Sequence, residues 1–225
     1  MIGSEGTLGI ITELTLKVIP APKSVISLII PYEKLRGLYC NSTTVLLCII
    51  WHHRLWNLWK KEVVMDTEKF LGKQVYPKEL EGTEIGAYLL ATFDGNSEEQ
   101  LEDIIEQASE VVLEAGAIDV LVADTPALKK DAWAVRGALL EAIEADTVLL
   151  DECDVVVPTN KIAEFLTYTK SLEAEADFRV KSFGHAGDGN LHIYTCSNDM
   201  RRRSLRNRLQ SLWIKYMQKQ QNSVE

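Results

Sequence analysis

The sequence lacks a long apolar run, a secretory leader and any cysteine pair with metal-binding spacing. No uninterrupted apolar stretch approaches the roughly 20 residues of a membrane-spanning helix, so a membrane protein is not expected. The start, MIGSEGTLGI, has neither the charged region nor the apolar core of a signal peptide. No CxxC motif is formed by the four cysteines, which are Cys40, Cys48, Cys153 and Cys196. We therefore expect reduced thiols in a cytoplasmic protein.

Positive charge is also scarce. The 225 residues carry a formal net charge of −9 at pH 7, which argues against general nucleic-acid binding because such binding uses clustered Lys and Arg. Hydrophobic residues make up 46% of the chain, so a packed core is expected and extensive disorder is excluded. The length suits one domain, or one domain with part of another.

Two segments break this composition. Residues 35–61 contain no Asp or Glu but hold three of the five tryptophans. Residues 201–225 carry a net charge of +6, against −15 for the 200 residues before them. In the first segment, Trp51, Trp56 and Trp59 could form an aromatic patch that binds a partner, and His52 and His53 could be metal ligands. In the second, Arg201 to Arg208 could form a basic arm that binds nucleic acid or an anionic membrane.

Strand and helix patterns alternate along the rest of the chain. Strands are predicted over residues 9–18, 24–31, 85–93, 118–122, 147–157, 178–183 and 190–196. Helices are predicted over residues 97–115, 125–145 and 158–172, the first with Ser97 as its N-cap and an apolar stripe at helical spacing. Because the last two strands meet across one short loop, we predict an α+β fold. Its sheet is antiparallel or mixed, with helices on one face.

The densest chemical signal is FGHAGDGNLHIY, residues 183–194. Its three glycines and the Asp188-Gly189 pair favour a tight turn between two strands. Such a hairpin could bring His185 and His192 onto one metal ion. It could equally be a glycine turn with one buried and one exposed histidine, and the spacing alone favours this simpler interpretation.

Three separated motifs resemble one enzyme family. They are IGSEGTLGIITELTLKVIP near the start, DECDVVVPTNKIAEF at residues 151–165 and GHAGDGNLH in the loop. Together they resemble the flavin-dependent D-2-hydroxy-acid dehydrogenases of the vanillyl-alcohol oxidase superfamily, which include glycolate oxidase, D-lactate dehydrogenase and D-2-hydroxyglutarate dehydrogenase. The resemblance implies that residues 1–22 are the end of an FAD-binding domain. Residues 23–200 are then an FAD-linked oxidase C-terminal cap domain, followed by the basic tail.

The resemblance implies a reaction and its cofactors. A D-2-hydroxy acid of the lactate or glycolate type is oxidised to a 2-oxo acid, and the carbon-bound hydrogen leaves as hydride to FAD. A divalent metal, zinc or manganese, positions the substrate and lowers the pKa of its hydroxyl. The implied electron acceptors include an electron-transfer flavoprotein or an iron–sulfur subunit.

The resemblance also assigns site residues. The metal ligands that it implies are His185 and His192. In this chain, Asp188, Glu152 or water could complete such a two-histidine site. Arg136 binds the substrate carboxylate, a role suited to a guanidinium, although a surface helix arginine explains it equally well. Asp188 and Asn190 orient a ligand or the substrate, or simply form the turn. The residues lining the flavin are Gly6, Thr7, Gly9 and Ile10, where a plain turn is the alternative.

The chain departs from the family where its composition is unusual. It ends before the segment SGEHGIG, which by resemblance supplies a carboxylate ligand and the catalytic histidine base. We therefore name no catalytic residue and expect this chain alone to be inactive. We interpret residues 35–61 and 201–225 as frameshifted family sequence, because with suitable codons a one-base shift turns Asn57-Leu58-Trp59 into Glu-Phe-Met. The alternatives are a non-catalytic metal- or carboxylate-binding module, a metal-dependent hydrolase and an inert product of a damaged gene.

Overall fold

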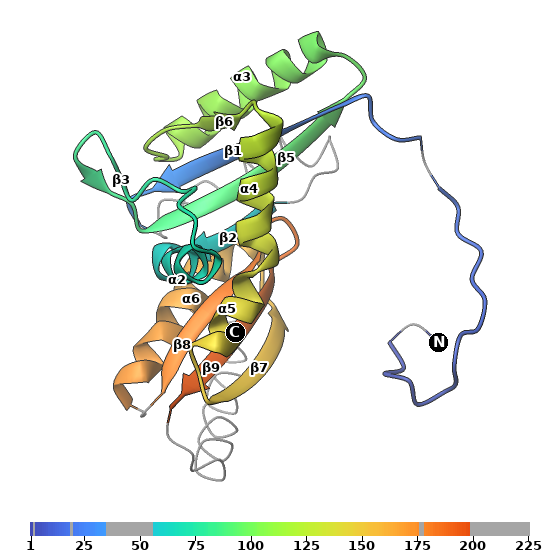
Figure 1. The fold of residues 1–225 in the computed structure, drawn as a ribbon, viewed down its shortest axis with the longest axis vertical. Coiled ribbons are helices and arrows are strands. Elements are labelled where there is room, and N and C mark those ends of the chain that lie inside the picture. Colours follow the sequence, from blue (N-terminus) through green and yellow to red (C-terminus); the bar gives the residue numbers. More distant parts are fainter. Residues whose placement is uncertain (2, 19, 35–55, 176–177, 199–225) are drawn as a thin grey trace, which may run out of the picture.

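A seven-stranded antiparallel sheet organises the chain. The computed structural model describes residues 1, 3–18, 20–34, 56–175 and 178–198 (Figure 1). The strand order is β6-β1-β5-β2-β8-β9-β7, and every neighbouring pair is antiparallel. The strands are β1 (Ser24–Tyr32), β2 (Trp56–Lys60), β5 (Ala87–Gly95), β6 (Leu121–Ala123), β7 (Leu149–Val156), β8 (Arg179–His185) and β9 (Asn190–Ser197). A separate hairpin pairs β3 (Glu79–Leu80) with β4 (Thr83–Glu84).

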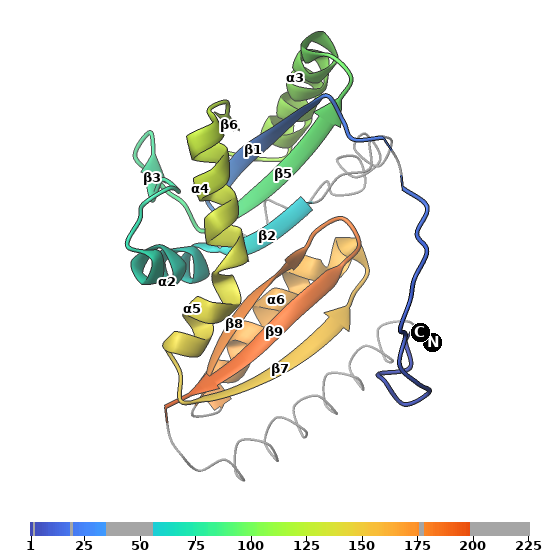
Figure 2. The same cartoon turned by 45° about the vertical axis from the view of Figure 1, so that its right-hand side comes forward.

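Helices cover both faces of the sheet. They are α2 (Lys61–Leu71), α3 (Glu98–Glu114), α4 (Pro126–Gly137), α5 (Leu139–Ala145) and α6 (Ile162–Ser171), with short 3-10 turns η1 (Thr159–Lys161) and η2 (Leu172–Glu175). One apolar core contains α3 and α6, and a second on the opposite face contains α2, α4 and α5 (Figure 2). None of the helices described is both long and apolar enough to span a bilayer.

The antiparallel sheet and the α+β class are confirmed, but the expected single helical face differs from the structure. Successive residues of a strand point to opposite faces of the sheet. In β5, Leu89 enters the first core and Leu90 the second, and both are nearly inaccessible to solvent. Because both faces of the central strand are apolar, both need a helical cover.

The expected helix over residues 97–115 is confirmed as α3, whose N-cap Ser97 accepts a hydrogen bond from the backbone N–H of Gln100 at 3.2 Å. The single helix expected over residues 125–145 is two helices, α4 and α5, which meet at Ala138. Strands β1, β5, β7, β8 and β9 lie close to their predicted ranges.

The strand expected over residues 9–18 is wrong. This segment is extended but pairs with no other strand of the described chain, and it runs apart from the sheet in both views (Figures 1 and 2). Its apolar side chains are exposed, with Ile10 at 90% and Val18 at 83%. The alternation that predicted a strand is present, but a strand also needs a neighbouring strand to accept and donate its hydrogen bonds.

Part of the unusual segment 35–61 is a central strand. Strand β2 lies between β5 and β8, and Trp59 is 1% exposed. Trp59 therefore belongs to the core, and its proposed role in a partner patch is wrong. The segment also contained the two candidate ligands His52 and His53, which lie outside the described residues, as does the tail 201–225.

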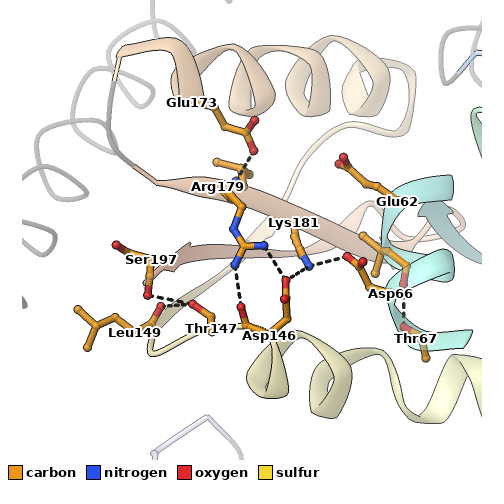
Figure 3. Close-up of polar contacts among 12 residues, drawn as sticks. Glu62, Asp66, Thr67, Asp146, Thr147, Leu149, Glu173, Arg179, Lys181 and Ser197 are labelled. Carbon is orange, nitrogen blue, oxygen red and sulfur yellow. Dashed lines mark hydrogen bonds and ion pairs between the residues drawn. The ribbon is translucent and has the colours of Figure 1, made fainter. Parts of the chain in front are cut away.

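An ion-pair network connects one end of β8 to the neighbouring helices (Figure 3). The ammonium of Lys181 donates to Asp66 at 2.6 Å and to Asp146 at 3.0 Å. Arg179 donates to the same Asp146 carboxylate at 2.6 Å and to its backbone carbonyl at 2.8 Å. The Lys181 side chain is only 7% exposed, so this network holds a buried charge between α2, the end of α5 and the sheet.

Candidate functional site

The other end of β8 contributes to a cluster of polar and aromatic side chains. In the antiparallel register, Asn57 of β2 lies opposite His185 of β8, and Phe183 lies opposite His192 of β9. His192 in turn lies opposite Asp154 of the outer strand β7. Since directly paired residues point to the same face of a sheet, four neighbouring strands present these side chains together. This is the face covered by α4 and α5.

Two glycines fix the loop that joins β8 to β9. A Cβ at Gly189, where φ is +77°, would lie 2.0 Å from the carbonyl oxygen of Val157. A Cβ at Gly184 would lie 2.4 Å from the carbonyl oxygen of Asn190. The backbone N–H of Gly189 also donates to the carbonyl of His185 at 3.1 Å. A side chain at either position would clash with this backbone, so both glycines are required for the close approach of the two strands that carry His185 and His192.

The predicted pair of histidines comes together. The rings of His185 and His192 have centroids 5.9 Å apart and planes at 74°. Nδ1 of His192 lies 2.5 Å from Oδ1 of Asp154. With its proton on Nδ1, the His192 ring donates to this carboxylate and leaves Nε2 free for a metal ion. Both histidines are half-buried, so the alternative of one buried and one exposed histidine is not the arrangement found.

Two acidic side chains of β7 extend this donor set. Glu152, Asp154 and His192 each offer a ligand atom, and these atoms all lie within 4.8 Å of one another. Glu152 was expected from the sequence as a completing ligand, whereas Asp154 was missed. The alternation in DECDVV was the signal that could have found it, because residues 152 and 154 of one strand share a face.

His185 has a buried nitrogen without a partner. Its Nδ1 is inaccessible to solvent and forms no hydrogen bond with any described residue. Burial lowers the pKa of His185, and the nearby Arg136 lowers it further, so the imidazole stays neutral and keeps a lone pair for a metal. Imidazole and carboxylate donors together suit zinc and related divalent ions, so the residues present fit such a metal.

Arg136 faces the same cluster from the last turn of α4. Its Nε donates to Oδ1 of Asn57 at 2.9 Å, and its guanidinium carbon lies 5.6 Å from the ring centroid of Phe183. Burial lowers the pKa of Arg136, and in the described part of the chain no carboxylate forms an ion pair with it. It is therefore not the solvated surface arginine that the sequence left open.

Two aromatic side chains pack against the polar groups of the cluster. Phe183 stacks on Tyr194 with ring centroids 5.3 Å apart and lies 5.2 Å from His192. The Tyr194 hydroxyl donates to Oε1 of Glu152 at 2.7 Å. Burial and this carboxylate raise the pKa of Tyr194, so it remains a protonated donor that fixes the Glu152 side chain.

The other site residues expected from the sequence either form the turn between β8 and β9 or lie apart from the cluster. Oδ1 of Asp188 accepts from the backbone N–H of Asn190 at 2.9 Å, as a turn-forming aspartate does. Thr7 donates its hydroxyl to the carbonyl of Ser4 at 2.6 Å within the exposed N-terminal segment. This segment holds the expected flavin-lining residues Gly6, Thr7, Gly9 and Ile10, which the structure does not bring to the cluster. The flavin-lining role of these residues therefore stays a prediction.

Comparison with known families gives one match over most of the chain. Residues 58–220 match the family model described as FAD linked oxidases, C-terminal domain. A D-lactate dehydrogenase of Anaerostipes hadrus is 88% identical over 203 residues, which cover 89% of this chain and 42% of that protein. Glycolate oxidase subunit GlcD of Bacillus subtilis is 29% identical over 97% of this chain and 44% of its own length.

Solved structures share the fold at low identity. An alkyldihydroxyacetonephosphate synthase has a TM-score of 0.63 and 13% identity over 95% of this chain and 44% of its own. A 4-ethylphenol oxidase from Gulosibacter chungangensis has a TM-score of 0.56 and 14% identity over 79% of this chain and 40% of its own. The chain thus spans less than half the length of the proteins that it matches.

Proposed function

This chain belongs to the family of FAD-linked oxidase C-terminal domains, and from that premise we propose that it binds the substrate of an enzyme that oxidises a D-2-hydroxy acid to a 2-oxo acid. The named relatives favour a lactate or glycolate type of acid, since they are a D-lactate dehydrogenase and a glycolate oxidase subunit. FAD enters this proposal through the family alone.

The observation that carries the proposal is the charge of Arg136, which pairs with no carboxylate of the described residues. A half-buried guanidinium without a carboxylate is costly unless a ligand neutralises it. Its Nε is occupied by Asn57, which leaves the two terminal nitrogens for two parallel hydrogen bonds to a carboxylate. A 2-hydroxy acid provides a carboxylate next to its hydroxyl, which suits a site with an arginine beside metal-binding histidines.

The proposed metal ligands are His185 and His192, with Glu152, whose Oε1 lies 3.7 Å from Nδ1 of His192, as a third. Asp154 holds His192 in the orientation that frees Nε2. When bound, a divalent metal would polarise the substrate hydroxyl and lower its pKa. The metal identity, zinc or manganese, stays a prediction.

Two further parts of the hypothesis concern the surroundings of the enzyme. Electron transfer to a flavoprotein or an iron–sulfur subunit stays a prediction from the resemblance. So does a cytoplasmic location, which Cys153 and Cys196 support as free thiols.

Calorimetry on the purified chain tests the proposed site. We expect zinc or manganese to bind the wild type, and His185→Ala and His192→Ala to abolish binding. Asp188→Asn is the matched control, since it removes an acidic group of the same loop and keeps the turn. Normal metal binding by both histidine variants would contradict the assignment.

D-lactate binding to the metal-loaded chain tests the arginine. Arg136→Ala should lose it, whereas Lys130→Ala, on an exposed position of the same helix, should keep it. Binding without turnover would favour the module that binds metal and carboxylate without catalysis. The clustering of Arg136 with His185 and His192, apart from residues 6–10, favours this second candidate.

A further inference from the structure

One buried amide joins the arginine and the histidine of this site. Asn57 is 1% exposed and lies directly opposite His185 in the pairing of β2 with β8. Its Oδ1 accepts from Nε of Arg136 at 2.9 Å. Its Nδ2 has no hydrogen-bond partner among the described residues, and neither has Nδ1 of His185. Two unpaired buried nitrogens therefore lie on paired positions of neighbouring strands, which a folded protein rarely tolerates.

The amide offers His185 the wrong hydrogen-bonding group for metal binding. If Nε2 of His185 binds a metal, the ring proton must sit on Nδ1, and that proton needs an acceptor. The Asn57 oxygen already accepts from Arg136, and no hydrogen bond joins Nδ2 of Asn57 to Nδ1 of His185. Asparagine therefore gives a proton on Nδ1 no acceptor, so nothing in this pair keeps the ring proton away from Nε2.

We propose that residue 57 is a positioning residue that sets both the orientation of Arg136 and the tautomer of His185, and that asparagine there weakens the metal site. A carboxylate at this position would accept from Arg136 with one oxygen and from Nδ1–H of His185 with the other. This inference rests on the proposed function, since it concerns the same metal and carboxylate site.

The first experiment reads the tautomer in the metal-free chain. Imidazole ¹⁵N NMR should show the His185 proton on Nε2 in the wild type and on Nδ1 in Asn57→Asp and Asn57→Glu. The Nε–H of Arg136 should exchange slowly with solvent in all three proteins and faster in Asn57→Ala. An unchanged tautomer in both acidic variants, or slow exchange in Asn57→Ala, would overturn the assignment. Two acidic variants of different length guard against misfolding of either one.

The second experiment measures the coupling with Zn²⁺ by calorimetry. Asn57→Asp should bind Zn²⁺ about 10- to 100-fold more tightly than the wild type, the range typical of groups that orient a ligand histidine. In a His185→Ala background, which we expect not to bind Zn²⁺, the same substitution should not restore binding, because the group that it orients is absent. Recovery of Zn²⁺ binding in that background would show simple charge attraction and overturn the inference. Absence of Zn²⁺ binding from every variant would instead overturn the proposed function, while the NMR result still decides the tautomer.

Discussion

At one end of strand β8, the ammonium of Lys181 contacts two carboxylates, and Arg179 contacts one of the same two. At the other end, on the same face, His185 has a buried nitrogen without a partner, and Arg136 has no carboxylate among the described residues. The two ends are four residues apart and equally part of one sheet. They differ in whether the protein itself supplies the opposite charge.

This difference separates stability from binding. A buried charge with its partners in place holds elements together, and its removal leaves uncompensated groups. A buried polar group without a partner costs free energy, and a ligand that supplies the missing group recovers that cost. We therefore expect changes at the Lys181 end to affect unfolding and changes at the His185 end to affect ligand binding.

The largest effect on stability is expected from Lys181→Met, which removes the charge but keeps most of the side-chain volume. Asp66 and Asp146 lose their shared partner, so the free energy of unfolding should fall by about 2 kcal/mol in urea denaturation. Zn²⁺ affinity should stay nearly unchanged. The control is Lys161→Met, which breaks an exposed pair with Glu164 and should cost below about 0.5 kcal/mol. Loss of Zn²⁺ binding together with stability in Lys181→Met would break the comparison.

An intermediate effect is expected from Phe183→Leu, at the boundary between the two ends. The variant loses the stacking with Tyr194 and the contact with His192, so we expect a loss of about 1 kcal/mol in the free energy of unfolding. Zn²⁺ affinity should also fall, because the His192 ring loses its support. Phe70→Leu serves as the control because Phe70 is 49% exposed. Equal effects of the two variants on both measurements would contradict this role.

A smaller effect on stability is expected from Arg136→Met. Removal of the unpaired charge should stabilise the fold, whereas loss of the hydrogen bond to Asn57 should destabilise it. Because the two effects oppose each other, the free energy of unfolding should change by no more than about 0.5 kcal/mol. D-lactate binding to the metal-loaded chain should be lost at the same time. If this variant unfolds as readily as Lys181→Met, Arg136 belongs to the structural network and not to a binding site.

The smallest effect is expected from the pH dependence of Asp146. Hydrogen bonds from Arg179, and then from Lys181, hold the pKa of this carboxyl below its usual value. Its contribution to stability is therefore full above the unfolded pKa of about 3.9 and is lost as the pH falls through the folded pKa. Between about pH 5 and about pH 3, the wild type should lose more stability than Asp146→Asn in urea denaturation. Equal losses in the two proteins would show that the pair adds nothing.

Local patterns were sufficient for most of the fold. The cap at Ser97 and the alternation in β7 and β9 carry their own signals, so these elements could be predicted from a few neighbouring residues. The segment 9–18 has the same alternation and forms no strand, because pairing depends on residues far away in the sequence. The second helical layer was missed for a related reason, since only the register of the sheet shows that Leu89 and Leu90 serve different cores.

The residues of the site also differ in whether the sequence alone could identify them. His185, His192 and Arg136 could be named from the sequence, and the structure brings them together. Asn57 could not be named, because its role follows from the pairing of β2 with β8, which no local pattern reveals. The expected flavin-lining residues are a separate case, since residues 6–10 lie apart from every other site residue.

Strand β7 has a second consequence for the behaviour of the protein, because it is the last strand of the described sheet. The outer side of an edge strand exposes backbone groups that can recruit a strand of another molecule and start aggregation. The exposed acids Asp151, Glu152 and Asp154 give this edge a negative charge that repels a second copy. A metal ion bound to Glu152 would neutralise part of that charge and would weaken this repulsion between copies.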